Sequence, residues 1–200
     1  MFAAAMDNVQ KHKDAGCGIA EKVISLAGFM GCGKSTVGKI LASRLGADFY
    51  DLDTLIEQNA GMTIPEIFTS QGEEAFRRME AQTLDTFLET MTNRRAVLSL
   101  GGGTLTTERC RQLLQGRALC IYLKASEDTL VRNLSGQADG RPMLEGARDE
   151  AALRERIKSL MARRSSIYEA AATHTIQVDA LSPDSIAASI LSLLPSSWRE

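Results

Sequence analysis

Residues 23–38 read Val-Ile-Ser-Leu-Ala-Gly-Phe-Met-Gly-Cys-Gly-Lys-Ser-Thr-Val-Gly. The first five residues of this stretch, 23–27, form an apolar run of the length of a buried strand. Apolar residues at helical spacing begin at Val37, and Gly46 is placed to end that helix. Between the two lies the pattern G-x-x-x-x-G-K-S, typical of a phosphate-binding loop, made by Gly28, Gly33, Lys34 and Ser35. The stretch therefore predicts a strand, a phosphate-binding loop and a helix in direct succession.

The residue types in this loop suit a phosphate chain. Glycines let backbone N–H groups wrap closely around a ligand, because they adopt backbone angles closed to other residues. The loop opens onto a helix N-terminus, where free N–H groups and the helix dipole favour an anion. Lys34 can reach the outer phosphates of a nucleoside triphosphate, and the Ser35 hydroxyl can ligate Mg²⁺. The dinucleotide-binding pattern G-x-G-x-x-G does not fit, because Met30 stands where its second glycine should be.

Length and composition narrow the class of protein. The 200 residues are enough for one domain with a core, and the net charge of −2 gives no general attraction to nucleic acid or anionic membrane. No apolar run approaches membrane-spanning length. The four cysteines show no C-x-x-C pair or zinc spacing, so we expect reduced thiols in a cytoplasmic protein. Residues 1–20 are polar and lack periodicity, and we expect them to be a disordered extension before a single domain over residues 21–195.

Short apolar runs alternate with helical patterns along the chain. Strands are predicted at residues 23–27, 47–53, 96–100, 118–123 and 175–178. After the helix that begins at Lys34, further helices are predicted at residues 54–59, 64–70, 71–91, 107–116, 126–134, 149–172 and 182–194. Such alternation predicts right-handed βαβ units, and therefore a parallel sheet with helices on both faces. Ligands of such sheets bind at the carboxyl ends of the strands.

Polar groups follow three of the predicted strands, as that rule requires. Asp51 and Asp53 leave the second strand on one face, where one could hold Mg²⁺ through water and the other could orient or deprotonate a substrate hydroxyl. The alternative is a pair of turn or cap residues, with Asp53 capping the next helix. Gly101–Gly103 could present N–H groups to a ligand, or could form only a flexible turn.

Two arginines fall on apolar helical stripes. Arg77 shares a helix face with Ala81, Leu84 and Leu88, and Glu80 is placed to pair with it. Arg164 falls four residues after Leu160 on a second such stripe. Arginine is rarely fully buried unless paired, so together they predict a carboxylate or phosphate between them. The alternative is that each pairs with an internal acid or reaches solvent.

Two further arginines are candidates for the nucleotide side. Arg141 lies in residues 135–144, a stretch without periodicity that is expected to be a mobile loop. It could close over the phosphates and exclude water, or it could be a solvated loop residue. Arg132 could lie over an adenine base or be a solvated helix residue.

With these residues assembled, the chain resembles the shikimate kinase family of phosphate-loop proteins. The resemblance covers roughly residues 22–194, and its motifs are Gly-Phe-Met-Gly-Cys-Gly-Lys-Ser-Thr (28–36), Asp-Leu-Asp (51–53), Gly-Glu-Glu-Ala-Phe-Arg-Arg-Met-Glu (72–80), Leu-Ser-Leu-Gly-Gly-Gly (98–103), Arg-Pro-Met-Leu (141–144) and Arg-Arg-Ser-Ser-Ile-Tyr (163–168). It implies a three-layer α/β/α phosphate-loop kinase fold with a five-stranded parallel sheet. It also implies a substrate-binding helical segment over residues 54–92 and a mobile lid over residues 135–148.

The resemblance further implies that a cytoplasmic monomer transfers the γ-phosphoryl of ATP to the 3-hydroxyl of shikimate, with Mg²⁺ as cofactor, on the route to aromatic amino acids. The implied catalytic residues are Lys34, Asp53 and Arg141. The implied nucleotide-binding residues are Gly31, Cys32, Gly33, Lys34, Ser35, Thr36, Arg132, Arg141 and Pro183. Shikimate would be bound by Asp53, Arg77, Gly101, Gly102, Gly103 and Arg164. Mg²⁺ would be served by Ser35 and Asp51, and the apolar side of the pocket would be formed by Ile64, Phe68 and Phe76.

One departure from the family pattern lies in the phosphate-binding loop, and two rival functions stay open. Cys32 stands where serine or alanine is more usual, and it is either a small tolerated side chain or a thiol whose alkylation would block nucleotide. One rival is a kinase for another small acid such as gluconate, or for a nucleotide, because arginines do not choose between carboxylate and phosphate. The other is a nucleotide-binding switch that hydrolyses or senses ATP and binds a protein. Such a switch does not require Asp53, Arg77 and Arg164.

Overall fold

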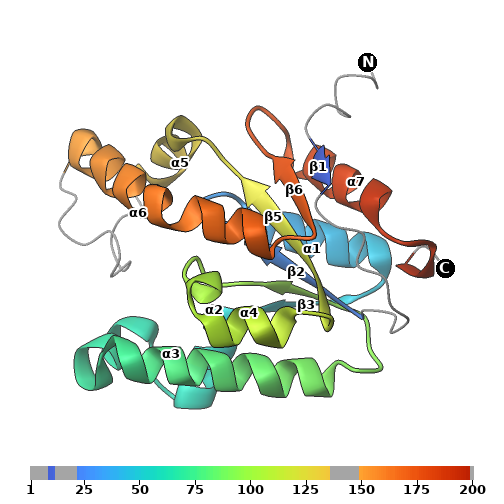
Figure 1. The fold of residues 1–200 in the computed structure, drawn as a ribbon, viewed down its shortest axis with the longest axis horizontal. Coiled ribbons are helices and arrows are strands. Elements are labelled where there is room, and N and C mark those ends of the chain that lie inside the picture. Colours follow the sequence, from blue (N-terminus) through green and yellow to red (C-terminus); the bar gives the residue numbers. More distant parts are fainter. Residues whose placement is uncertain (1–8, 12–21, 136–148, 199–200) are drawn as a thin grey trace.

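A six-stranded sheet with the strand order β1-β6-β5-β2-β4-β3 forms the middle of the molecule (Figure 1). The computed structural model describes residues 9–11, 22–135 and 149–198. Five strands run parallel, as expected: β2 (Val23–Ala27), β3 (Asp48–Asp51), β4 (Ala96–Ser99), β5 (Ala118–Lys124) and β6 (His174–Gln177). The central strands β2, β4 and β5 are buried along almost their whole length, because helices cover both faces of the sheet.

The expectation of disorder over residues 1–20 does not hold for the three residues that form a sixth strand. Strand β1 (Val9–Lys11) pairs antiparallel with β6, with Val9 opposite Ile176 and Lys11 opposite His174. A three-residue strand is too short to produce a period-2 signal, and its backbone groups are satisfied by a partner about 165 residues further along the chain. The other residues of this segment lie outside the described ranges.

Helices on both faces complete the expected three layers. They are α1 (Lys34–Leu45), α2 (Leu52–Ala60), α3 (Ile64–Thr90), α4 (Glu108–Leu114), α5 (Glu127–Leu134), α6 (Glu150–Ala171) and α7 (Pro183–Leu193), with short 3-10 turns at Thr104–Thr106 and Ser196–Trp198. In Figure 1, α1 and α7 lie together on one side of the sheet, and α3 and α4 lie together on the other. Alternate side chains of β2 enter different hydrophobic clusters, with Ile24 and Leu26 in one and Val23 and Ala27 in the other.

The structure agrees with the two helices expected over residues 64–70 and 71–91. They follow each other within α3, where the backbone leaves the helical conformation at Gly72, whose φ of 82° and ψ of 171° are closed to other residues. Pro65 does not break a helix here. It lies in the first turn of α3, where no helical N–H is required, and Thr63 caps that turn with Glu66. The bend separates the first turns of α3 from the part that carries Arg77.

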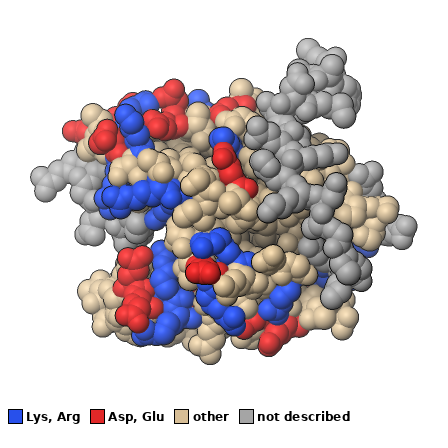
Figure 2. Space-filling model, in the orientation of Figure 1, with Lys and Arg blue, Asp and Glu red and all other residues tan. Residues whose placement is uncertain are grey.

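Acidic and basic side chains alternate over the face shown in Figure 2, so no continuous patch of one sign covers it. None of the helices within the described ranges combines the length and apolar character needed to cross a membrane.

Candidate active site

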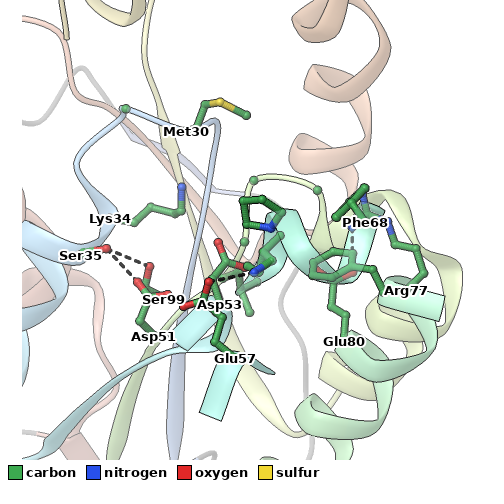
Figure 3. Close-up of a pocket in the computed structure, with 18 of the residues that line it drawn as sticks. Met30, Lys34, Ser35, Asp51, Asp53, Glu57, Phe68, Arg77, Glu80 and Ser99 are labelled. Carbon is green, nitrogen blue, oxygen red and sulfur yellow. Dashed lines mark hydrogen bonds and ion pairs between the residues drawn. The ribbon is translucent and has the colours of Figure 1, made fainter. Parts of the chain in front are cut away.

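A cavity of about 380 Å³ opens at the carboxyl ends of β2, β3 and β4 (Figure 3). Its walls come from the loop between β2 and α1, the start of α2, both parts of α3, the turn after β4, and α6. The three stretches expected at this sheet edge therefore meet there, because parallel strands bring their carboxyl ends together. Ile64, Phe68 and Phe76 line the cavity, which agrees with the apolar side expected from the sequence.

The phosphate-binding loop holds its lysine over its own backbone. The Lys34 ammonium donates to the carbonyl oxygens of Gly28 and Phe29 at 3.0 and 3.1 Å, and its side chain is buried. Gly28 has a φ of 145°, and a Cβ there would lie 2.6 Å from the Leu123 carbonyl oxygen. The loop thus needs glycine at this position for both backbone angle and space.

Cys32 points beneath the loop rather than into the cavity. Its side chain is only 4% exposed, and a Cβ on Gly28 would lie 2.7 Å from its Sγ. Burial of this kind supports the interpretation of Cys32 as a small tolerated side chain.

Asp51, the last residue of β3, connects this strand to the phosphate-binding loop. Its Oδ2 accepts a hydrogen bond from the Ser35 hydroxyl at 2.9 Å, and its Oδ1 accepts from the Asp53 N–H at 3.2 Å. Asp51 is therefore the N-cap of α2, and Asp53 lies in the first turn. The alternative that Asp53 caps the helix is wrong, because α2 begins two residues earlier than the sequence indicated.

Asp53 lies in a setting that resists ionisation. Its pKa is raised from 3.8 to about 6, mainly by burial and then by the nearby Asp51 carboxylate, while Lys34 partly opposes both effects. A carboxyl group poised near neutral pH beside a phosphate-binding lysine is suited to orient a hydroxyl and accept its proton.

The glycines of residues 101–103 lie so close to other parts of the site that a side chain there would press against them. A Cβ on Gly101 would lie 2.6 Å from Asp53 Oδ1, and one on Gly103 would lie 2.7 Å from Arg77 Nη2. A Cβ on Gly102 would lie 3.2 Å from the Met30 N atom in the phosphate-binding loop. The triple glycine is therefore a close contact surface for three parts of the site.

Arg77 meets the internal acid that the sequence indicated. Its Nη1 donates to Glu80 Oε2 at 2.8 Å, and its Nη2 donates to Glu73 Oε1 at 3.3 Å. Glu80 is 1% exposed, and Thr104 donates to its other oxygen at 2.7 Å. The spacing of the sequence indicates Glu80 as a partner for Arg77 but does not indicate that Glu80 lines the cavity. That place depends on packing between distant segments, such as the contact of Glu80 with Thr104 across 24 residues.

Arg164 reaches the cavity from the opposite side. It is 6% exposed, and its Nη1 donates to the Gly102 carbonyl at 3.1 Å. Tyr168, one helical turn further along α6, donates to the same carbonyl. In the sequence Tyr168 has the pattern of an apolar stripe residue, although its place four residues after Arg164 puts both on one helix face.

The remaining candidates lie away from this cavity or outside the described ranges. Arg132 is exposed on α5, where it donates to Thr129 Oγ1 at 3.3 Å, and its neighbour Asn133 donates to the Gly31 carbonyl at 2.9 Å. Thr36 and Pro183 are exposed at the starts of α1 and α7. Arg141 and the expected lid over residues 135–148 fall almost entirely outside the described residues.

Comparison with known proteins gives consistent matches. A family model described as shikimate kinase matches residues 30–195. A shikimate kinase of Chlorobium chlorochromatii is 44% identical over 162 residues, covering 79% of this chain and 83% of that protein. One of Chlorobium phaeobacteroides is 40% identical, covering 78% and 82%. Among solved structures, shikimate kinase from Acinetobacter baumannii in complex with shikimate has a TM-score of 0.79 at 31% identity, covering 90% of this chain and 96% of that one.

Proposed function

Because this chain belongs to the shikimate kinase family, we propose that it transfers the γ-phosphoryl of ATP to the 3-hydroxyl of shikimate. The products are shikimate 3-phosphate and ADP, and the reaction serves aromatic amino acid biosynthesis. The observation that carries this proposal is the meeting of Asp53, Arg77 and Arg164 in one cavity with Lys34. Neither the composition nor the cavity calls for a macromolecular partner, and we expect a cytoplasmic monomer that acts on small molecules, without nucleic acid or membrane.

The acceptor side of the cavity matches a hydroxylated carboxylic acid. Arg77 and Arg164 approach it from different helices, and guanidinium groups bind a carboxylate through paired N–H donors. Asp53 faces the acceptor hydroxyl in this proposal, while Gly101–Gly103 leave room for a ring beside it. The apolar residues Phe68 and Phe76 cover the non-polar part of the substrate.

The nucleotide side follows from the phosphate-binding loop. Backbone N–H groups of residues 31–36 surround the phosphates, and Lys34 exchanges its contacts with loop carbonyls for phosphate oxygens. Arg141 supplies further positive charge, and Arg132 and Pro183 lie nearest the base. These roles are assigned by position in the family motif.

Ser35 and Asp51 would hold the Mg²⁺ that accompanies ATP. Their oxygen atoms lie 2.9 Å apart, and oxygen donors are what this hard cation prefers. The described residues contain no group of three or more His, Cys, Asp or Glu that could hold a metal. That fits Mg²⁺, which keeps several waters and binds substrate phosphates rather than a full protein cage. When bound, the ion would neutralise charge on the phosphate oxygens.

Positioning and charge stabilisation carry the catalysis, because phosphoryl transfer passes through a loose transition state. Arg77 and Arg164 hold the acid so that its hydroxyl faces the γ-phosphorus. Asp53 accepts a hydrogen bond from that hydroxyl and takes its proton as the P–O bond forms. Lys34 stabilises the charge that develops on the transferred group.

A coupled assay of ADP release tests this function directly. Shikimate, gluconate and a nucleoside monophosphate are compared as acceptors, with a no-acceptor control and a control containing EDTA. We expect strong turnover only when shikimate is the acceptor. We also expect this turnover to be lost when EDTA removes the divalent cation. Turnover with gluconate or the nucleotide would favour the rival kinases, and acceptor-independent hydrolysis would favour a nucleotide switch.

The acid limb of the pH–rate profile should report Asp53. Its pKa of about 6 means that the carboxylate needed to accept the proton is lost as pH falls through 6. We therefore expect kcat/KM for shikimate, measured with ATP well below its own KM, to fall about tenfold per pH unit below that value, because the rate then follows groups of the free enzyme. A profile that stays flat down to pH 4.5 would remove Asp53 as the base.

Replacing Gly103 with alanine should disturb substrate binding without unfolding the protein. Gly103 has an ordinary φ of −112°, and the atoms nearest to the new Cβ would be those at the flexible end of Arg77. Displacing that guanidinium should raise KM for shikimate about tenfold, the size of one charge-assisted hydrogen bond. KM for ATP and the melting temperature serve as internal controls, and a parallel rise in both KM values would contradict this account.

A further inference from the structure

The Gly102 carbonyl accepts two hydrogen bonds from one helix. Arg164 Nη1 donates at 3.1 Å and the Tyr168 hydroxyl also donates, across 62 and 66 residues of sequence. A carbonyl oxygen has two lone pairs, so these donors satisfy it completely. The two side chains stand four residues apart on α6, which places them one above the other on the same helix face.

The Tyr168 hydroxyl is held more rigidly than the Arg164 guanidinium. Tyr168 is 1% exposed, and its ring packs against the fully buried ring of Tyr122 with centroids 5.2 Å apart. Two χ angles fix a tyrosine, whereas arginine has four. Burial also raises the pKa of Tyr168 to about 12, so its hydroxyl keeps its proton throughout the working range of the enzyme.

The Tyr168 hydroxyl affects the substrate side of the site through the peptide group that joins Gly102 to Gly103. Gly102 lies between Gly101, which approaches Asp53, and Gly103, which approaches Arg77. In a trans peptide the C=O and the following N–H point in opposite directions, so fixing the Gly102 carbonyl also fixes the Gly103 N–H. The same carbonyl uses one of the five N–H donors of Arg164 and leaves the guanidinium in a defined orientation.

We propose that Tyr168 is a positioning residue for the acid substrate, because its hydroxyl anchors the Gly102 carbonyl and thereby orients both Arg164 and the triple-glycine turn. Tyr168 does not touch substrate in this account. Its ring is fixed in the core between α6 and β5, so its hydroxyl holds the Gly102 carbonyl in place. That carbonyl in turn restricts the flexible Arg164 side chain, which binds the carboxylate in this account. The inference rests on the proposed function, since it assigns Arg164 to that carboxylate.

The chain offers a matched control for this proposal. Tyr122 is as deeply buried as Tyr168 and belongs to the same ring pair, but its hydroxyl lies beside the Ser165 side chain and donates no hydrogen bond to Gly102. Tyr168→Phe and Tyr122→Phe therefore remove the same atom from neighbouring rings and leave both rings in place. Only the first of them removes a donor from Gly102.

Kinetics of these two variants test the role. Tyr168→Phe should raise KM for shikimate about 3- to 10-fold, the range of one neutral hydrogen bond, with KM for ATP unchanged. Tyr122→Phe should leave both constants at wild-type values. In an Arg164→Lys background, Tyr168→Phe should add less than about twofold, because residues that act through one network are not additive. An unchanged KM for shikimate, equal rises for both substrates, or full additivity with Arg164→Lys would each overturn the proposal.

A spectroscopic measurement tests the contact without relying on activity. The chain has two Gly–Gly peptide bonds, Gly101–Gly102 and Gly102–Gly103. Protein labelled with ¹³C-carbonyl and ¹⁵N glycine therefore gives two signals in a carbonyl-to-amide correlation spectrum. The Gly102 carbonyl signal should move upfield in Tyr168→Phe and stay in place in Tyr122→Phe, and a signal that does not move would overturn the contact. Folded wild-type protein without shikimate-dependent turnover would instead overturn the proposed function.

Discussion

Asp53→Asn should lower kcat with shikimate by about 10²–10⁴-fold while ATP binding survives, because the loss of a general base has this typical size. Asparagine keeps the shape of the side chain and removes its ability to take the proton. Turnover in the coupled assay and titration calorimetry with ATP measure the two effects. Asp48→Asn, at the exposed start of the preceding strand β3, removes one surface carboxylate that pairs with Arg94 and should leave kcat within about twofold, since surface pairs contribute little. Equal turnover of Asp53→Asn and wild type would remove Asp53 from the mechanism.

The same substitution should stabilise the protein at neutral pH. The folded-state pKa of Asp53, about 6, lies above its ordinary value of 3.8, so ionising this group opposes folding. Its favourable contribution is complete below about pH 4 and is lost as pH rises through about 6. Asparagine carries no charge at any pH, so the unfolding free energy should rise by as much as about 3 kcal/mol at pH 8. Thermal melts without nucleotide or divalent cation should show a gap between variant and wild type that narrows toward pH 4.

Arg77→Ala should raise KM for shikimate by about 10- to 100-fold and change KM for ATP much less, since it removes charge-assisted hydrogen bonds to the acid. Its neighbour Arg78 is the matched control. Arg78 pairs with Glu74 at 2.6 Å on the exposed face of α3, so Arg78→Ala should change neither constant. A larger rise in KM for ATP than for shikimate would move Arg77 out of the substrate pocket.

A second variant separates binding from folding at this position. Glu80 is buried, so Arg77→Ala leaves its carboxylate without the cation and should cost about 3–5 kcal/mol of stability, the usual cost of breaking a buried pair. Arg77→Lys keeps a cation beside Glu80 but loses the planar fork that grips a carboxylate. It should therefore melt close to wild type and still raise KM for shikimate. If Arg77→Lys has the wild-type KM for both shikimate and ATP, the positive charge alone accounts for the role of Arg77.

Local patterns were enough to predict most of the elements. The parallel strands and the helix after the phosphate-binding loop follow from apolar periodicity and from glycines at their ends, and these signals lie within one short stretch each. The arginine stripes were also informative, because an arginine at helical spacing among leucines must meet an anion or an acid. What periodicity could not predict was a partner, since Glu80 with Thr104 and Tyr168 with Gly102 join residues 24 and 66 positions apart.

The phosphate-binding loop, the parallel α/β/α arrangement and the family could all be predicted from the residues, because they depend on residue types at fixed short spacings. The packed structure was needed to show that β1 extends the sheet, that Asp51 rather than Asp53 caps α2, and that each glycine of residues 101–103 lies against a different part of the site. Such contacts depend on how far each element is turned and displaced when the core packs. A spacing pattern carries no information about these rotations and displacements. The chemistry of this site depends on them, because they set which side chains meet in the cavity.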